Sequence, residues 1–415
     1  MRSSGFMWLL VLILLILDTY IFQAVKMVSQ QSSPKAKIII YSLYWVLSIV
    51  TILMLILLPY IGYENWNKSF RNYVFAIIIG LFFAKMVTSF FLLIDDVRRA
   101  MTWIVTCLTG NPGIESPHTD SGISRSAFLS WLGIAAGGGI FGILLYGFSN
   151  KYRYQVKRVK LAYNNLPAAF KNLKIVQVSD IHSGSFTNKE AVLKGIQKIM
   201  DQKPDLILFT GDLVNDKASE MKDYMDVFSR LTAPLGVYSV LGNHDYGDYV
   251  KWESSAAKAE NLEALKGIHK ALGWRLLMNE HVSLERGNDK IALLGIENWG
   301  AKGRFTKYGK MTEAYPGSEQ YPFKILLSHD PSHWDAEVRT NYPDIDLMLS
   351  GHTHGMQFGF EIPGFKWSPV QYMYKQWGGL YEEDKQKLYV NRGFGFIGYP
   401  GRVGILPEIT LIELV

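Results

Sequence analysis

The sequence predicts an α/β domain preceded by a four-helix transmembrane region. Up to about Phe148 the chain carries several long apolar runs, whereas after Lys151 charged residues, turns and short strands alternate as in a soluble domain. Within that second part, short β-rich runs alternate with helical spacing of apolar residues. The length of 415 residues suits two regions, and we expect a transmembrane domain at residues 1–150 and a second domain at residues 151–415.

Four apolar runs in the first region are long enough to cross a membrane. A hydrocarbon core of about 30 Å takes roughly 20 helical residues. The runs are Phe6–Val25, Ile38–Ile61, Tyr73–Ile94 and Phe128–Phe148. The first run is too long for the apolar part of a signal peptide, and no small-residue cleavage site follows it, so we expect it to remain as a membrane helix.

The fourth run contains glycines spaced for close helix packing. Gly133 and Gly137 form one small-xxx-small pair, and Gly138 and Gly142 form another. Such pairs allow two helix backbones to approach each other, although glycines are also tolerated in membrane helices without a partner. The sequence leaves both interpretations open.

Two ionisable residues lie inside the apolar runs, where an unpaired charge is costly. Asp18 is the 13th residue of the first run and Lys85 is the 13th residue of the third. Because the first and third spans run in the same direction, we expect the two side chains at similar depth. We predict that they pair inside the helix bundle; the alternative is that each reaches a membrane interface separately.

Basic residues cluster just after the last apolar run. The cluster consists of Lys151, Arg153, Lys157, Arg158 and Lys160, and it contributes to the formal net charge of +6. Its position favours lipid headgroups over nucleic acid as a partner, with a solvated surface as the alternative. The side of the membrane that holds the N-terminus and the second domain carries eight basic residues and the opposite side six, which favours a cytoplasmic second domain.

Polar residues follow most of the predicted strands of the second domain. We expect strands at Lys174–Val178, Leu206–Thr210, Val237–Leu241, Lys324–Leu327, Leu347–Leu349 and Ile409–Leu414, and a helix at Asn188–Gln202. Loops beyond the carboxyl ends of strands converge on one crevice in layered α/β proteins. The polar residues in those loops are therefore expected to meet in one site.

The expected site has ligands for two divalent metal ions. The candidates are Asp180, His182, Asp212, Asn243, His329, His352 and His354. Carboxylate and amide oxygens and imidazole nitrogens suit manganese, iron or zinc, and the identity of the metals stays open. Cys107 is the only cysteine, which excludes an intrachain disulfide and a site built from thiolates.

Asp212 is predicted to bridge the two ions. A carboxylate has two oxygens, and Gly211 permits the sharp turn that presents them. Asp180 and His182 alternate on what we expect to be an extended segment, so that both point the same way. Together with His354 they are predicted to hold the first ion.

The second ion is assigned to the remaining candidates. Asn243, His329 and His352 are predicted to complete its ligand shell. His352 and His354 are expected to share one face of the chain, with Thr353 turned away.

The residues around these candidates form an ordered series of motifs. They are Asp180-Ile181-His182, Gly211-Asp212, Gly242-Asn243-His244-Asp245, Ser328-His329-Asp330-Pro331 and Gly351-His352-Thr353-His354-Gly355. From about Leu173 to Leu414 the chain resembles the calcineurin-like metallophosphoesterase family, and every ligand position of the family's motifs is present. The resemblance implies the metallophosphoesterase fold, a two-sheet β-sandwich flanked by helices, and hydrolysis of phosphoesters.

The expected reaction uses a hydroxide that bridges the two metal ions. The hydroxide attacks phosphorus in line with the departing oxygen, and the leaving group then needs a proton. His244, next to the ligand Asn243, is the candidate proton donor, and Asp245 is expected to orient it. The alternative for His244 is a structural role.

Two further features near the C-terminus have two interpretations each. Arg392 and Arg402 lie in a glycine-rich segment and could bind a second phosphate of a diphosphate substrate, or they could be exposed arginines of an ordinary turn. The aromatic stretch Phe365–Trp377 could form an amphipathic wall or membrane contact, or it could pack in the core.

Within the family, the chain resembles a membrane-associated branch that includes bacterial phosphodiesterases and UDP-2,3-diacylglucosamine pyrophosphatases. The features are the apolar N-terminal region, the Tyr163–Phe170 lead into the first strand, and Pro407-Glu408-Ile409-Thr410-Leu411. The resemblance implies a bacterial inner-membrane enzyme of lipid A biosynthesis. Its expected partners are the bilayer and a lipid-linked diphosphate such as UDP-2,3-diacylglucosamine.

Other functions remain as alternatives. The same metals would serve a phosphodiesterase or phosphatase that acts on soluble substrates. A nuclease is not expected, because the basic residues cluster at the membrane junction and not around the ligand loops. From a different class, the chain could be a membrane receptor or scaffold with an inactive phosphoesterase domain. Oligomeric state is not predicted.

Overall fold

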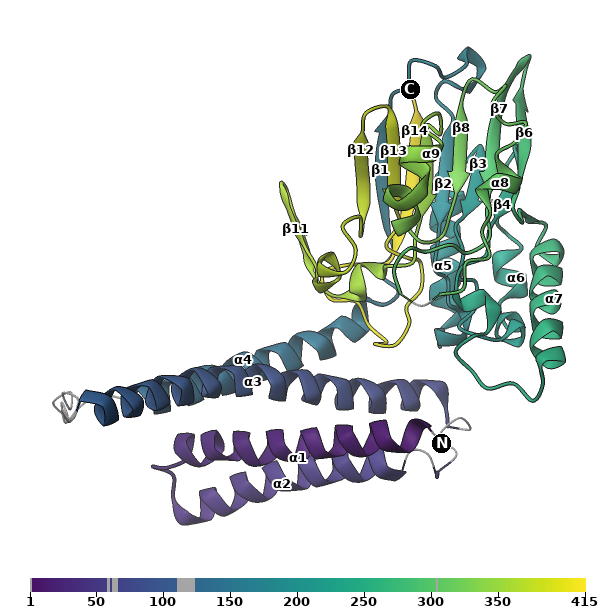
Figure 1. Ribbon diagram of the computed structural model, residues 1–415. Helices are drawn as coiled ribbons and strands as arrows, with labels where there is room; N and C mark the ends of the chain where they lie inside the picture. The colour runs from purple at the N-terminus through teal and green to yellow at the C-terminus, as the bar shows by residue number, and fades with distance from the viewer. Residues whose placement is uncertain (1, 58–59, 62–65, 110–123, 304) are drawn as a thin grey trace. The chain divides into compact units, whose positions relative to one another are not determined.

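The computed structural model describes residues 2–57, 60–61, 66–109, 124–303 and 305–415. It divides into two compact units, Met1–Tyr146 and Gly147–Val415 (Figure 1). Each unit is described by itself.

The described residues of the first unit form four long helices. They are α1 (Arg2–Val28), α2 (Pro34–Leu57), α3 (Lys68–Thr109) and α4 (Arg125–Gly147). Each is long and apolar enough to cross a membrane. Three of the predicted runs fall almost entirely within these helices, whereas part of Ile38–Ile61 lies outside the described residues. Helix α3 continues well beyond the predicted end at Ile94, because the polar residues that follow are also compatible with a helix.

The predicted pairing of Asp18 with Lys85 is confirmed. Lys85 Nζ lies 2.7 Å from Asp18 Oδ1, and both side chains are buried between helices. Ser48 donates a hydrogen bond of 2.7 Å to the same carboxylate oxygen, and the Tyr44 hydroxyl lies 3.1 Å from it. The pair therefore links α1 to α3 inside the bundle, with α2 supplying hydroxyl groups.

One pair of α4 glycines allows close helix packing, and the other pair has no helix partner in the part of the chain that the structure describes. A side chain at Gly137 would come within 2.2 Å of Thr88 Oγ1, and one at Gly133 within 3.1 Å of the Thr88 carbonyl oxygen. Added side chains at Gly138 and Gly142 would meet nothing within 4 Å. The first pair therefore lets α4 approach α3 closely, whereas the second pair has no neighbour among the described residues.

The described residues of the second unit form two six-stranded sheets and a separate hairpin (Figure 1). The first sheet has the order β1 (Gln155–Leu161), β14 (Glu408–Leu414), β2 (Lys174–Val178), β3 (Leu206–Phe209), β4 (Val237–Ser239) and β5 (Arg275–Leu276). The second has the order β12 (Gly379–Glu383), β13 (Gln386–Val390), β9 (Leu347–Ser350), β8 (Lys324–Leu327), β7 (Asp289–Gly295) and β6 (Glu280–Arg286). The hairpin consists of β10 (Phe360–Ile362) and β11 (Phe365–Trp367).

The two sheets pack face to face, and helices cover their outer faces. Alternation along β8 explains the layers: Ile325 and Leu327 belong to the core between the sheets, whereas Leu326 belongs to the outer core. The described helices of this unit are α5 (Lys189–Met200), α6 (Met225–Phe228), α7 (Ser255–Ala271), α8 (Met311–Ala314) and α9 (Arg339–Asn341). The predicted two-sheet sandwich flanked by helices is therefore confirmed.

The basic cluster after the last apolar run is largely a strand. Strand β1 pairs in parallel with β14 at the edge of the first sheet. Lys160 lies 3.2 Å from Glu413, and Lys157 lies 3.5 Å from Glu361 of the hairpin. The strand was not predicted, because its sequence QVKRVKL lacks a regular alternation of polar and apolar residues. The cluster thus forms part of the folded second unit.

Candidate metal centre

The seven candidate ligands all lie beyond the carboxyl ends of strands, as expected. Five of them form two overlapping groups of buried side chains whose ligand atoms lie within 4.8 Å of one another. The groups are Asp180, His182 and His354, and Asp180, Asp212 and His329. The first group matches the predicted first-metal set, and Asp180 belongs to both.

Asp212 lies between residues of the two predicted sets. Its Oδ2 atom is 3.1 Å from His329 Nε2 and 3.6 Å from His182 Nε2. Its Oδ1 atom accepts a hydrogen bond of 2.8 Å from the backbone N–H of His244. One carboxylate thus faces histidines of both sets, which is the position that a bridging ligand requires.

The other two candidates contact each other. Asn243 Oδ1 lies 2.8 Å from His352 Nδ1, and the remaining ring nitrogen of His352 lies 2.9 Å from the Tyr374 hydroxyl. The same hydroxyl lies 3.4 Å from Asp330, the residue after His329. Sequence reasoning did not identify Tyr374 as a site residue, because nothing distinguishes it from the other aromatic residues around it.

Hydrogen bonds at the ring nitrogen that faces away from the carboxylates orient the imidazoles of His329 and His354. His329 Nδ1 lies 2.7 Å from the Thr210 carbonyl oxygen, so the ring donates this N–H and directs Nε2 to Asp212. Arg402 Nη2 lies 3.2 Å from His354 Nδ1. Each ring is therefore held at one nitrogen while the other faces the carboxylates.

Burial and charge set the protonation of the cluster. Burial lowers the pKa of His182, His352 and His354, although nearby aspartates oppose this effect. Burial alone would raise the pKa of Asp180 and Asp212, but the facing histidines outweigh it and hold both values below the usual range. Charged carboxylates and neutral imidazoles are the forms that bind a metal ion. His329 differs from the other three histidines, because the facing Asp212 carboxylate raises its pKa.

The ligand loops have left-handed backbone, which corrects one sequence prediction. The φ angles of Asp180, His182, Asp212, His352 and His354 are 51°, 47°, 62°, 72° and 50°. The ligands therefore do not alternate on extended segments; they converge because tight turns follow the strands. Such conformations cost about 1–3 kcal/mol per residue and are typical of functional sites.

The donor set fits divalent metal ions. His182 Nδ1 is buried and has no hydrogen-bond partner among the described residues. Nε2 of His182 lies 3.0 Å from Nε2 of His354. Uncompensated polar atoms are costly in a protein interior. A cation bound by the imidazole nitrogens and the two carboxylates would compensate for this cost, and the ligand types suit manganese, iron or zinc.

His244 and Asp245 do not interact as predicted. His244 Nδ1 lies 2.8 Å from the Asn215 carbonyl oxygen, which therefore orients the ring. The Asp245 carboxylate instead accepts N–H groups of the turn that carries Asp212, at 2.9 Å from Asp212 N and 2.8 Å from Leu213 N. The expectation that Asp245 orients His244 is wrong, because this carboxylate is needed to satisfy the donors of the buried turn.

Arg392 and Arg402 are buried and bonded to protein groups. Arg402 donates to the carbonyl oxygens of Arg392 at 2.7 Å and Gly393 at 3.1 Å. Arg392 Nη1 lies 2.6 Å from Glu408. The alternative of exposed arginines in a turn is wrong, and the geometry gives no support to the contact with a second phosphate.

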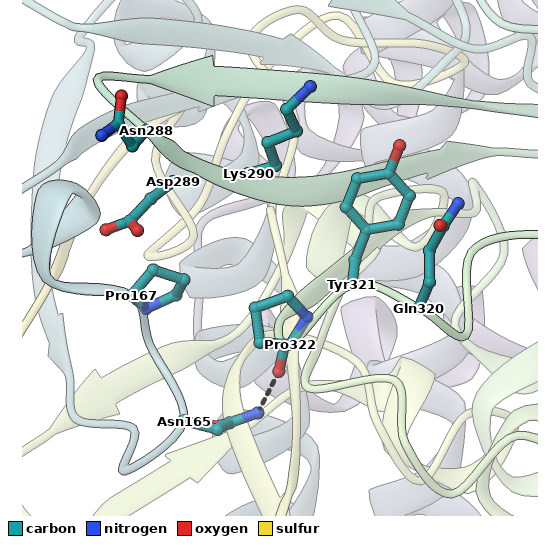
Figure 2. A pocket seen from close by; sticks show the side chains of 8 residues that line it. All are labelled: Asn165, Pro167, Asn288, Asp289, Lys290, Gln320, Tyr321 and Pro322. Atoms are coloured by element: carbon teal, nitrogen blue, oxygen red, sulfur yellow. Dashed lines mark hydrogen bonds between the residues drawn. The ribbon is translucent and has the colours of Figure 1, made fainter.

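A cavity of about 550 Å³ lies at the other end of the strands (Figure 2). It is lined by residues that precede β2 and β8 or lie at the start of β7, including Asn165, Asp289 and Pro322. The Asn165 amide donates to the Pro322 carbonyl oxygen at 2.7 Å, and Asp289 accepts the Ala169 N–H at 2.9 Å. These groups close loops, and the cavity contains none of the candidate ligands.

A buried cluster of carboxylates and imidazoles at the strand ends of a two-sheet sandwich defines a metal-dependent phosphoester hydrolase. The chain belongs to the calcineurin-like phosphoesterase family, whose model matches residues 173–356. Residues 1–151 match a second model, described as the transmembrane domain of a probable calcineurin-like phosphoesterase. The first unit therefore carries a family-typical membrane domain.

Three relatives illustrate the similarity. The phosphodiesterase YaeI of Escherichia coli is 30% identical over 63% of this chain and 88% of its own length. The UDP-2,3-diacylglucosamine pyrophosphatase LpxG of Chlamydia trachomatis is 29% identical over 61% of this chain and 88% of its own length. A transmembrane protein with metallophosphoesterase domain of Danio rerio is 29% identical over 66% of this chain, which spans 60% of that relative.

Proposed function

We propose that this protein is a membrane-anchored, two-metal phosphodiesterase or diphosphatase that acts on a lipid-linked diphosphate. The observation that carries the proposal is the joint presence of a buried ligand cluster and four apolar helices in one chain. A catalytic unit tethered at a bilayer meets amphiphilic substrates more often than soluble ones. The relative named as a UDP-2,3-diacylglucosamine pyrophosphatase supports this substrate class.

The proposed ligand assignment follows the geometry of the cluster. Asp180, His182 and His354 would hold one ion, and Asp212 would serve both ions because it faces His182 and His329. Two dications at such a site would supply a nucleophilic water near neutral pH and would offset the charge on the phosphoryl oxygens.

The second ion would take its ligands from three loops. His329 faces Asp212. Asn243 Oδ1 and His352 Nδ1 lie 2.8 Å apart, and these two atoms would bind the ion. Tyr374, bonded to the far nitrogen of His352, would fix that ring.

His244 is proposed to protonate the leaving group. Its Nδ1–H is used by the Asn215 carbonyl oxygen, which leaves Nε2 for proton transfer, and the ring centre lies 4.9 Å from that of His182. Asp245 is proposed to act indirectly, by holding the turn that presents Asp212. Arg402 likewise acts through His354, which it contacts.

We also propose a bacterial inner membrane location with the second unit on the cytoplasmic face. The support is the excess of basic residues on that side of the predicted topology, eight against six. Accessibility of single engineered cysteines to an impermeant reagent in intact cells would test this orientation.

The full chain, purified and supplied with manganese, tests the proposed activity. Hydrolysis of an aryl phosphodiester reports on the metal centre, and hydrolysis of UDP-2,3-diacylglucosamine reports on the substrate class. We expect both activities, and we expect Asp212→Asn to remove both. Activity on the aryl ester alone would favour the alternative of soluble substrates. No activity with metal bound would favour a receptor or scaffold.

A further inference from the structure

The hairpin formed by β10 and β11 belongs to neither sheet of the second unit. Its strands pair only with each other, with Phe360 opposite Trp367 and Ile362 opposite Phe365, and Pro363 and Gly364 form the turn. Figure 1 shows it beside the sheets, marked by the label β11. It lies in the chain segment that connects His354 to Tyr374, and both of these residues contact the metal centre.

The polarity of this hairpin is the reverse of that in an ordinary surface hairpin. One face carries Phe360, Ile362, Phe365 and Trp367, since cross-strand partners share a face. The first three are 45%, 60% and 53% exposed. The opposite face carries the paired residues Glu361 and Lys366, which are both partly buried. The apolar face therefore points to the outside.

Ion pairs and hydrogen bonds hold the polar face against the protein. Glu361 accepts a hydrogen bond of 2.8 Å from Arg392 Nε, and Arg392 is in turn paired with the buried Glu408 at 2.6 Å. Lys366 Nζ lies 2.5 Å from the Gly378 carbonyl oxygen and 3.1 Å from the Tyr381 hydroxyl. Rotation of the hairpin to bury its apolar face would break these contacts, so the outward orientation is built into the fold.

The exposed apolar surface continues beyond the hairpin, and Lys302 lies at its border, where its Nζ donates to the Met373 carbonyl oxygen at 2.5 Å. Tyr372 is 78% exposed and Met373 is 59% exposed. Between Phe358 and Tyr374 the only charged residues are Glu361 and Lys366, which lie on the other face. The aromatic stretch Phe365–Trp377 therefore has an exposed part and a buried part. Tyr374 and Trp377 belong to a buried cluster, as expected for core packing.

We propose that this apolar hairpin face docks into the lipid bilayer that holds the first unit. Aromatic and aliphatic side chains without outward charge are typical of surfaces that enter the interfacial region of a membrane. The four apolar helices of the same chain keep a bilayer within reach of the second unit. Because the hairpin segment begins and ends at the metal centre, docking holds that centre at the lipid surface.

Fluorescence quenching in the full chain tests the docking. In a Cys107→Ser background, Ile362→Cys carries an environment-sensitive fluorophore, and the chain is reconstituted in lipid nanodiscs. The matched control is Asn288→Cys, at the exposed tip of the hairpin formed by β6 and β7 in the same unit. We expect lipids with a quencher on the acyl chain to quench the label at 362 and not the label at 288. Aqueous iodide is expected to act in the reverse order.

Two outcomes would overturn the proposal. Equal quenching by iodide at both positions would mean that the hairpin stays in water. Protection of position 362 from both quenchers would mean that protein covers it, as in an interface with a second copy of this chain.

A second measurement concerns catalysis and rests on the proposed function, whereas the quenching does not. The double variant Ile362→Ser/Phe365→Ser is expected to retain hydrolysis of the soluble aryl phosphodiester, which also checks folding. Hydrolysis of the diphosphate lipid in the bilayer is expected to fall by about tenfold, because docking raises local concentration. Equal retention of both activities in a variant that no longer docks would refute the catalytic role of docking.

Discussion

Nε2 of His329 lies 3.1 Å from Oδ2 of Asp212, and this contact joins loops that follow two different sheets. Burial would lower the pKa of His329, but the facing Asp212 carboxylate raises it to about 10. A metal ion at this position would compete with a proton for the imidazole nitrogen, so metal binding is expected to strengthen with rising pH, as metal titrations at several pH values would measure.

Replacement of Asp212 tests the bridging role. Asp212→Asn removes the charge that faces both His182 and His329, so we expect loss of bound metal and of hydrolysis. The loss of activity should exceed the roughly 10- to 100-fold loss that follows replacement of a residue that only hydrogen-bonds to a metal ligand. Metal analysis and aryl phosphodiester hydrolysis are the measurements. The control is Asp289→Asn, the same change at the opposite strand ends, which should retain both properties.

Replacement of His244 separates proton transfer from metal binding. His244→Gln is expected to lower kcat by about 10²- to 10⁴-fold, because a general acid is lost while the metal ligands remain. Metal content should stay unchanged. His281→Gln is the control, since His281 also holds a backbone carbonyl oxygen through Nδ1, at 2.9 Å, away from the site. Loss of metal in the His244 variant would exclude the proposed role.

The Asp18–Lys85 pair predicts non-additive effects in the first unit. Asp18→Asn or Lys85→Met alone leaves a buried charge without its partner, at a cost of about 3–5 kcal/mol. The double variant removes both charges and should be more stable than either single variant. Thermal unfolding in detergent measures all three. If the double variant is as unstable as the sum of the single variants, the ion pair contributes nothing.

The buried His269, which lies outside the metal centre, is expected to make the stability of the second unit depend on pH. Burial lowers its pKa to about 3 in the folded chain, and among the described residues the imidazole hydrogen-bonds only to Ser239 Oγ, at 2.9 Å. The unfolded chain, with a pKa near 6.5, therefore takes up a proton first as the pH falls. The contribution of the neutral His269 to the free energy of unfolding is fully present above about pH 6.5. It decreases toward pH 3 by about 1.4 kcal/mol per pH unit.

The His269→Asn variant retains a polar partner for Ser239 but does not titrate. Between pH 7 and pH 5 the wild type should therefore lose about 2 kcal/mol more stability than the variant. Chemical unfolding of the full chain at the two pH values measures this difference. Parallel loss in both proteins would mean that His269 does not govern it.

Much of the second unit could be predicted from local sequence patterns. The bounds of β2 and β8 agree with the prediction, and Asn188 caps α5 by accepting the Ala191 N–H at 2.9 Å. These elements have continuous buried apolar runs or a capping residue. Strand β1 was missed, because an edge strand with three basic residues among seven resembles a solvated linker.

The contacts around the site were harder to predict than the candidate ligands. The motifs identified which residues converge, but the left-handed turns that bring them together were not visible in the spacing. The partners of Arg402 and Asp245 depend on backbone groups of distant loops, at Gly393 and Asp212. Such partners are fixed by tertiary structure and leave no pattern in the sequence.

The buried pair between α1 and α3 also constrains how the first unit is made. Helix α1 is synthesised before α3, so the Asp18 carboxylate reaches the membrane long before the ammonium group of Lys85 exists. Until then the charge stays near water or within the insertion machinery, because lipid disfavours it. The helices must therefore settle in the bilayer as a group, and a nascent chain interrupted before α3 should be retained poorly in the membrane.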